Sequence, residues 1–270
     1  MDDNFQMPTG QLMAGKRGLV MGVANRNSIA WGISAQLAAQ GAQVGLAYME
    51  ANEKRVRPLG ESIGASLYTA FDAASDSSME AAFKVVEDQW GTIDFLVHAI
   101  AFAGRDQIKG SFVENATREG FAQALDISAY SFVDAARRAA RLMPDGGSMI
   151  TLTYLGSERA IPNYNTMGVA KAALEAATRY IARDLGPQGI RVNAISAGAM
   201  RTLSLAGISG GRGMLAQGRA LSALKEDTSM EGVAGAALWL LSDIGRSTTG
   251  EIVHVDAGFH MMGLPSGEDE

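Results

Sequence analysis

Two side chains near the middle of the chain, Tyr164 and Lys171, have the types and the spacing for chemistry on a bound ligand. A neutral phenol can donate a hydrogen bond or a proton, and a lysine ammonium can bind hydroxyl groups and stabilise negative charge. Seven residues of helix rise about 10 Å, so both side chains would leave one helix face nearly two turns apart. A nicotinamide ribose fits that gap, with the lysine on its hydroxyls and the tyrosine directed at a substrate. Taken alone, the pair is better explained by an ordinary amphipathic surface helix.

A second feature is the turn Gly22–Ser28 (GVANRNS), which follows an apolar run and leads into a helical pattern. Gly22 permits a tight turn, and a helix opening at Ser28 presents free N–H groups and a positive dipole end to a pyrophosphate. The glycine pattern G-x-G-x-x-G, usual in dinucleotide-binding turns, is absent. A plain strand-to-helix turn with an N-cap serine therefore remains an alternative.

The end of the second expected strand bears on which dinucleotide would bind. Tyr48 is followed by Met49 and Glu50, so no arginine or lysine stands there for a 2′-phosphate, and Glu50 would repel one. Lys54 and Arg55 come within reach only if the chain folds back, and NADH is favoured over NADPH. Asp72, after the third strand, is placed to accept a hydrogen bond from an adenine amino group, with a turn or helix-cap role as the alternative.

The elements that must position these residues follow from the alternation of short apolar runs with longer amphipathic stretches. Such alternation is typical of βαβ units, a parallel sheet and helices on both faces. The predicted fold is therefore α/β, a doubly wound, Rossmann-like parallel sheet of about seven strands in a single domain, 1–270, with loosely ordered ends at 1–14 and 263–270. The expected strands are Gly18–Gly22, Gln43–Tyr48, Ser66–Phe71, Asp94–Ala99, Ser148–Thr153, Ile190–Ile195 and Glu251–Val255, and the expected helices are Ser28–Gln40, Asn52–Ser62, Ser78–Trp90, Arg118–Leu142, Tyr164–Leu185 and Met230–Leu241.

Composition excludes several classes of protein. The chain has no cysteine, and its 3 histidines do not sit at metal-ligand spacings, so neither a disulfide nor a metal site is expected. The net charge of −6 argues against a nucleic-acid surface. The acidic start lacks the basic and apolar regions of a secretory signal, and no segment approaches the roughly 20 apolar residues of a membrane helix. A cytoplasmic location without membrane association is expected.

The run Tyr154–Tyr164 (YLGSERAIPNY), the lysine at 171 and the segment Arg191–Gly198 (RVNAISAG) form one pattern, to which Thr117–Phe121 and Asp126–Ser128 add. From about residue 12 to residue 259 the sequence resembles the short-chain dehydrogenase/reductase superfamily. It is most similar to the divergent branch of bacterial NADH-dependent enoyl-[acyl-carrier-protein] reductases. Ordinary members use Tyr-x-x-x-Lys with a serine on the preceding strand. Here Met167, which cannot donate a proton, stands four residues before the lysine, and Tyr154 occupies the serine position, so a ketone reductase with the usual triad is disfavoured.

The resemblance implies hydride transfer from NADH to the β-carbon of a trans-2-enoyl thioester carried on acyl carrier protein, a step of fatty acid elongation. It implies that Tyr164 donates to the thioester oxygen, that Lys171 binds the ribose, and that Tyr154 lines the acyl pocket or assists proton delivery. Ala103 matches a substrate contact, and a homotetramer packed through 118–142 and 164–185 is implied. The implied cofactor contacts are Gly22, Ser28, Ile29, Met49, Asp72, Ala73, Ile100, Lys171, Met200, Arg201, Thr202, Leu203 and Ser204.

Three features depart from the family pattern. Ala101 stands where many relatives have glycine, beside the expected nicotinamide pocket, and Ala199 stands where relatives often have proline. The loop Gly207–Gly213 carries one positive charge where relatives often carry several, so carrier docking is a weaker expectation than the chemistry.

The segment 200–225 is expected to cover the substrate, with plain core packing of its apolar residues as the alternative. Two other functions remain open on the sequence: an ordinary short-chain enzyme acting on ketones or hydroxyl groups, and a non-catalytic NADH-binding regulator.

Overall fold

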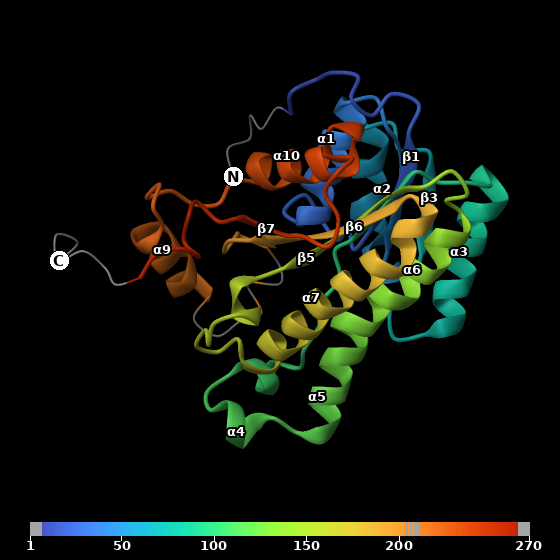
Figure 1. Cartoon of the computed structure of the whole chain (residues 1–270). Helices are drawn as coiled ribbons and strands as arrows, with labels where there is room; N and C mark the ends of the chain where they lie inside the picture. Colours follow the sequence, from blue (N-terminus) through green and yellow to red (C-terminus); the bar gives the residue numbers. More distant parts are fainter. Residues whose placement is uncertain (1–6, 203–204, 206, 208–210, 264–270) are drawn as a thin grey trace.

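A seven-stranded parallel sheet forms the centre of the computed structural model, which describes residues 7–202, 205, 207 and 211–263 (Figure 1). The strand order is β3-β2-β1-β4-β5-β6-β7, and every neighbouring pair is parallel. The predicted doubly wound α/β fold is confirmed, and each expected strand is present. The strands are β1 Arg17–Met21, β2 Gln43–Tyr48, β3 Leu67–Ala70, β4 Phe95–His98, β5 Gly147–Thr153, β6 Ile190–Ala197 and β7 Ile252–Val255.

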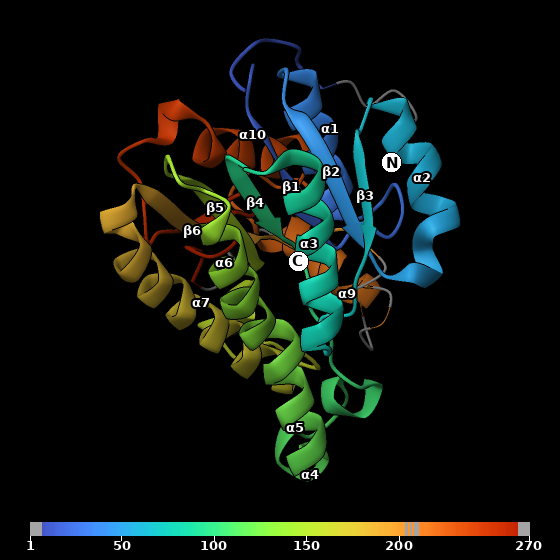
Figure 2. The ribbon, with the colours of Figure 1, turned by 90° about the vertical axis from the view of Figure 1, so that its right-hand side faces the viewer.

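Helices cover both faces of the sheet, which is why the central strands are continuous apolar runs. α1, α2 and α10 pack on one face, and α3, α6 and α7 lie side by side on the other (Figure 2). Every residue of β4 is buried. The helices are α1 Ile29–Ala39, α2 Glu53–Ser62, α3 Asp76–Trp90, α4 Phe112–Asn115, α5 Arg118–Leu125, α6 Ser131–Arg141, α7 Asn165–Leu185, α9 Gly211–Leu221 and α10 Met230–Leu241.

The helix expected over Arg118–Leu142 is interrupted, which corrects the sequence prediction. A π-helical turn, Asp126–Tyr130, joins α5 to α6. Ser128, fully buried in this turn, accepts the N–H of Phe102 at 3.0 Å and donates to the carbonyl of Phe102 at 3.1 Å. A contact with a segment 26 residues earlier therefore fixes the wider turn, and local sequence carries no sign of it.

The segment before β1 contacts α1. Met13 is fully buried, and its N–H donates to the carbonyl of Gln40 at 2.9 Å. The Gln40 side chain in turn donates to the carbonyl of Pro8 at 2.8 Å. Residues 1–6 and 264–270, which belong to the ends expected to be loose, lie outside the described residues. Among the helices of the described ranges, none has both the length and the apolar character that crossing a membrane requires.

Candidate active site

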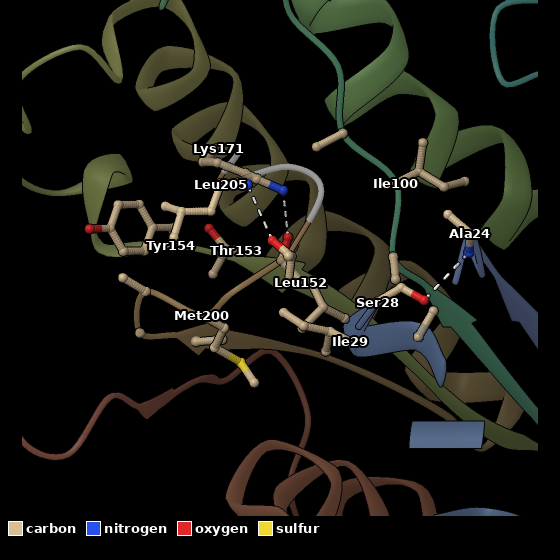
Figure 3. Close-up of a pocket in the computed structure, with 18 of the residues that line it drawn as sticks. Ala24, Ser28, Ile29, Ile100, Leu152, Thr153, Tyr154, Lys171, Met200 and Leu205 are labelled. Carbon is tan, nitrogen blue, oxygen red and sulfur yellow. Dashed lines mark hydrogen bonds between the residues drawn. The ribbon is translucent and has the colours of Figure 1, made fainter. Parts of the chain in front are cut away.

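A cavity of about 210 Å³ opens where β1, β4, β5 and β6 end. The carboxyl ends of parallel strands meet at one edge of the sheet, and the strand order reverses between β1 and β4, the position where doubly wound folds bind ligands. Figure 3 shows side chains from these strand ends and from α7 turned toward a common space. The predicted site residues that line the cavity are Gly22, Ser28, Ile29, Ile100, Tyr154, Tyr164, Lys171, Met200 and Thr202.

The turn after β1 fits a pyrophosphate. Gly22 has φ +99°, and a Cβ there would lie 2.1 Å from the carbonyl oxygen of Ala99, so only glycine lets β1 and β4 approach this closely. Ser28 does not cap α1: its hydroxyl donates to the carbonyl of Asn25 at 2.6 Å and accepts the N–H of Ala24. Because no side chain caps this helix, its first N–H groups remain available to an anion.

Other predicted cofactor residues lie at the same sheet edge but do not line the cavity. Met49, after β2, is 58% exposed. Asp72, after β3, accepts the N–H of Ala74 at 2.9 Å, so its carboxylate shapes the turn before α3, as the turn alternative expects. Ala73 is half-buried against the α3 face of the core. Their contact with a cofactor stays a prediction.

The remaining predicted residues lie on the substrate side. Ala103 packs in a small apolar cluster with Tyr154, Tyr164 and Met167. Arg201 is exposed next to the cavity residue Met200. Two predicted contacts, Leu203 and Ser204, fall outside the described residues.

Lys171 is a nearly buried cation whose position is fixed by the sheet. Its side chain extends from α7, and Nζ donates to the carbonyl of Leu152, in β5, at 2.6 Å (Figure 3). Burial lowers the pKa of Lys171 to about 8, and the negative charge of Glu175 opposes this effect. The ammonium that lines the cavity is therefore weakly solvated and holds its proton only moderately tightly.

Tyr164 is held by its two neighbours rather than by the helix. It is the residue before α7, so the expectation of two side chains on one helix face is wrong at this end. Asn163 and Asn165 both have positive φ, a conformation that asparagine tolerates. The Asn163 side chain accepts the N–H of Gly110 at 2.9 Å, and the Asn165 side chain donates to the carbonyl of Gly110 at 3.1 Å. These bonds fasten the tyrosine to the loop between β4 and α4.

The two tyrosine rings lie edge to face, with centroids 4.9 Å apart. Burial raises the pKa of Tyr164 far above its ordinary value and also raises the pKa of Tyr154. Within the described residues, neither hydroxyl has a hydrogen-bond partner, and both rings line the cavity. The site thus offers a neutral phenol donor beside a cation, while Met167 is buried in the apolar cluster.

Two polar residues of the site were not found by sequence reasoning. Thr153, the last residue of β5, lines the cavity, and Glu175 lies buried one turn beyond Lys171 on α7. The Thr153 hydroxyl donates to the Glu175 carboxylate at 2.6 Å. A threonine at a strand end and a glutamate within a helical pattern are common, so neither residue stands out in the sequence. Only the fold, which packs α7 on β5, shows that both belong to the site of Lys171. No cluster of metal-ligating side chains occurs among the described residues.

His98 ends β4 and is completely buried below the cavity. Its Nδ1 lies 2.9 Å from the hydroxyl of Thr151, and its Nε2 lies 2.8 Å from that of Ser131. The Ser131 hydroxyl also donates to the carbonyl of Ile127 at 2.6 Å, and the Thr151 hydroxyl donates to the carbonyl of His98 at 3.2 Å. Burial, and then the charge of Lys171, lower the pKa of His98 to about 3. The ring joins β4, β5 and α6 in its neutral form.

This neutral histidine predicts a specific acid sensitivity. Unfolded chains take up a proton on histidine below pH about 6.5, whereas the folded chain does not until pH about 3, so stability is lost as pH falls through this window. The unfolding free energy of the protein is expected to fall by about 2 kcal/mol more than that of His98→Gln between pH 7.5 and pH 5. Urea unfolding of both proteins at the two pH values measures the difference, and parallel losses would contradict it.

Comparison with known proteins identifies what this chain is similar to. The family model described as "Enoyl-(Acyl carrier protein) reductase" matches residues 22–260. An enoyl-[acyl-carrier-protein] reductase [NADH] of Rhizobium meliloti is 50% identical over 256 residues, covering 94% of this chain and 95% of the relative. The solved enoyl reductase of Anaplasma phagocytophilum in complex with NAD has a TM-score of 0.92 and 49% identity, covering 97% of this chain and 100% of that one. The Bacillus cereus enoyl-acyl carrier protein reductase, solved with NADP+, has a TM-score of 0.91 and 46% identity, covering 94% of this chain and 100% of that one.

Proposed function

Since the chain belongs to the enoyl-(acyl carrier protein) reductase family, it is an NADH-dependent enoyl reductase of fatty acid elongation, and we propose that the cavity around Tyr164 and Lys171 is its active site. The reaction adds a hydride to the β-carbon of a trans-2-enoyl thioester and a proton to the α-carbon. The observation that carries this assignment is an unpartnered, buried phenol beside a buried ammonium in a cavity at the strand ends.

NADH, when bound, supplies the hydride. The open N-terminus of α1 and the Gly22 turn are proposed to hold its pyrophosphate, and Lys171 its nicotinamide ribose hydroxyls. Ile29, Ile100 and Met200 provide apolar walls that exclude water from the reacting atoms. The other predicted contacts at Met49, Asp72, Ala73, Arg201 and Thr202 belong to the same proposal, as do Leu203 and Ser204, outside the described residues.

Tyr164 is proposed to stabilise the charge that appears during the reaction. As the β-carbon is reduced, negative charge develops on the thioester carbonyl oxygen, and a hydrogen bond to that oxygen is strongest in the transition state. The phenol is suited to this role because its raised pKa keeps it protonated at neutral pH and no described residue takes its hydrogen bond. The ammonium of Lys171 adds a positive field on the same side of the cavity.

Tyr154 and the segment 200–225 are proposed to form the acyl side. Tyr154 packs its ring against Tyr164 and lines the cavity, where it contacts the acyl chain or assists proton delivery. Ala103, in the same apolar cluster, is the proposed substrate contact. Leu205 and the α9 residue Met214 also line the cavity, which supports the role of this segment as a cover. Core packing of α9 alone would leave these side chains away from the cavity.

The acyl group is proposed to arrive on acyl carrier protein, as the names of the relatives indicate for those proteins. A homotetramer packed through 118–142 and 164–185 is also proposed, because Tyr130, Val133, Val169 and Tyr180 expose apolar or aromatic surface on those helices. A cytoplasmic location completes the proposal and is supported by a sequence without cysteine, which needs no oxidising compartment.

Glu50 predicts selectivity between the two dinucleotides. It is exposed directly after Met49 at the end of β2, where a 2′-phosphate would meet its negative charge. We expect NADPH to bind about tenfold or more weakly than NADH, and Glu50→Gln to narrow the ratio chiefly by improving NADPH binding. Fluorescence titrations with both dinucleotides measure the ratio, with Glu61→Gln, an exposed change on α2, as the control. A relative from Bacillus cereus was solved with NADP+, so the preference needs to be measured in this chain. Equal affinities of the unaltered protein for NADH and NADPH would contradict the prediction.

The experiment that tests the function follows NADH oxidation by absorbance with crotonyl and longer enoyl thioesters, and with a ketone as control. Oxidation that depends on the enoyl substrate and is lost in Lys171→Ala supports both the reaction and the site. Turnover with ketones alone would move the protein to the ordinary short-chain reductases, against which Met167 argues. Tight NADH binding without turnover of any substrate would favour the alternative of a non-catalytic NADH-binding regulator.

A further inference from the structure

Glu175 is a buried carboxylate with no part in the mechanism described above. Its side chain is 6% exposed, and it stands four residues after Lys171, so the two side chains leave the same face of α7. Carboxylates are almost never this buried without a compensating partner. The partner that the structure provides is the Thr153 hydroxyl, 2.6 Å from Oε1.

The end of β5 holds both charged groups at once. The carbonyl of Leu152 accepts the hydrogen bond of the Lys171 ammonium at 2.6 Å, and the next residue, Thr153, donates to the carboxylate of Glu175. Successive strand residues thus bind successive turns of the helix. The ammonium and the carboxylate are each bonded to the strand rather than to each other, so their attraction acts at a distance through a poorly solvated interior.

From this geometry we propose that Glu175 is a positioning residue for Lys171: its buried carboxylate, oriented by Thr153, keeps the cofactor-binding side chain charged. The proposal rests on the role proposed for Lys171. Catalysis would need such a group because the cavity around the ammonium is largely apolar, and an isolated buried lysine loses its proton near neutral pH. A neutral amine is a poorer donor to ribose hydroxyls and supplies no field to a developing enolate.

The other ionisable groups around Lys171 do not provide this negative charge. His98, on β4, is neutral, and Tyr164, before α7, is a protonated phenol. Tyr154 is likewise protonated, and Asp256, after β7, acts on Tyr154 and is bonded to His260. Among the described groups, Glu175 is the carboxylate whose charge opposes the loss of the Lys171 proton.

The test is Glu175→Gln, which removes the charge but keeps an oxygen to accept from Thr153. NADH dissociation constants are measured by fluorescence from pH 6 to 9.5. The pH at which affinity is half lost is expected to fall by about a unit, so the variant binds NADH nearly normally at pH 6, about threefold more weakly at pH 7.5 and about tenfold more weakly at pH 9. Asp184→Asn, which removes an exposed charge from the same helix, should leave the profile unchanged, and Glu175→Asp should restore most of it.

A second measurement needs no cofactor. In the unaltered, cofactor-free protein labelled with ¹⁵N-lysine, the Nζ signal missing from Lys171→Arg reports the titration of Lys171 directly. A midpoint that falls by about a unit in Glu175→Gln supports the proposal. An unchanged midpoint overturns it, as does a loss of affinity in Glu175→Gln that is the same at every pH. If the premise, that Lys171 binds the cofactor, is wrong, the result is different: Lys171→Ala would then bind NADH normally.

Discussion

Tyr164→Phe is expected to lower kcat for enoyl thioester reduction by about 100- to 1,000-fold, the usual effect of removing one donor to a developing oxyanion. The change deletes only the hydroxyl, which has no partner among the described residues, so the ring still packs against Tyr154 and folding should be unaffected. Because the lost hydrogen bond forms in the transition state, kcat and kcat/KM should fall together, while NADH affinity stays near normal. Steady-state kinetics and a fluorescence titration measure these quantities.

A matched control is available on β3. Tyr68→Phe removes a hydroxyl that, like that of Tyr164, has no hydrogen-bond partner among the described residues, and it should leave kcat unchanged. The pH dependence adds a further check. Because the pKa of Tyr164 is raised well above its ordinary value, its ionisation should not limit activity between pH 6 and 9. A kcat within threefold of the unaltered enzyme in Tyr164→Phe would remove Tyr164 from the mechanism.

Lys171→Ala is expected to weaken NADH binding by roughly 10- to 100-fold, the effect of losing hydrogen bonds from a charged donor. The same variant should lose nearly all enoyl reduction, because both the ribose contact and the positive field disappear. Fluorescence titration gives the affinity, and thermal unfolding in the absence of NADH separates loss of binding from loss of structure. Lys84→Ala, at an exposed position on α3, is the control. Intact NADH affinity in Lys171→Ala would show that the role proposed for this lysine is wrong.

The sheet was predictable because its strands are buried on both faces. Runs such as Phe95–His98 carry no polar alternation, so length and flanking turns identify them as strands of a covered parallel sheet. The order β3-β2-β1-β4 comes from the structure, and the position of the ligand cavity, at the reversal between β1 and β4, agrees with the expectation for a doubly wound sheet. Local sequence and global fold agree here, and prediction succeeds.

The parts that could not be predicted depend on contacts between distant residues. The π-helical turn is fixed by the two hydrogen bonds between the Ser128 hydroxyl and the backbone of Phe102. The sequence of residues 118–142 taken alone favours an uninterrupted helix. The helical pattern predicts Glu175 to be a solvent-exposed polar residue of an amphipathic helix, yet the packing of α7 on β5 buries it. Tyr164 and Lys171 were identified through their spacing. The sequence did not predict that Tyr164 is fixed before the helix begins, which is what orients its side chain.

The fastening of Asn163 and Asn165 to Gly110 bears on how such an enzyme can change its substrate range. The loop between β4 and α4 carries Ala103 on the proposed acyl side, and its far end is the anchor of the proposed proton donor. Insertions or deletions in this loop, the usual route to a new specificity, would therefore shift the phenol as well as the pocket. Evolution or design of acyl preference in this chain should proceed by side-chain replacement at constant loop length, because selectivity and turnover share one piece of backbone.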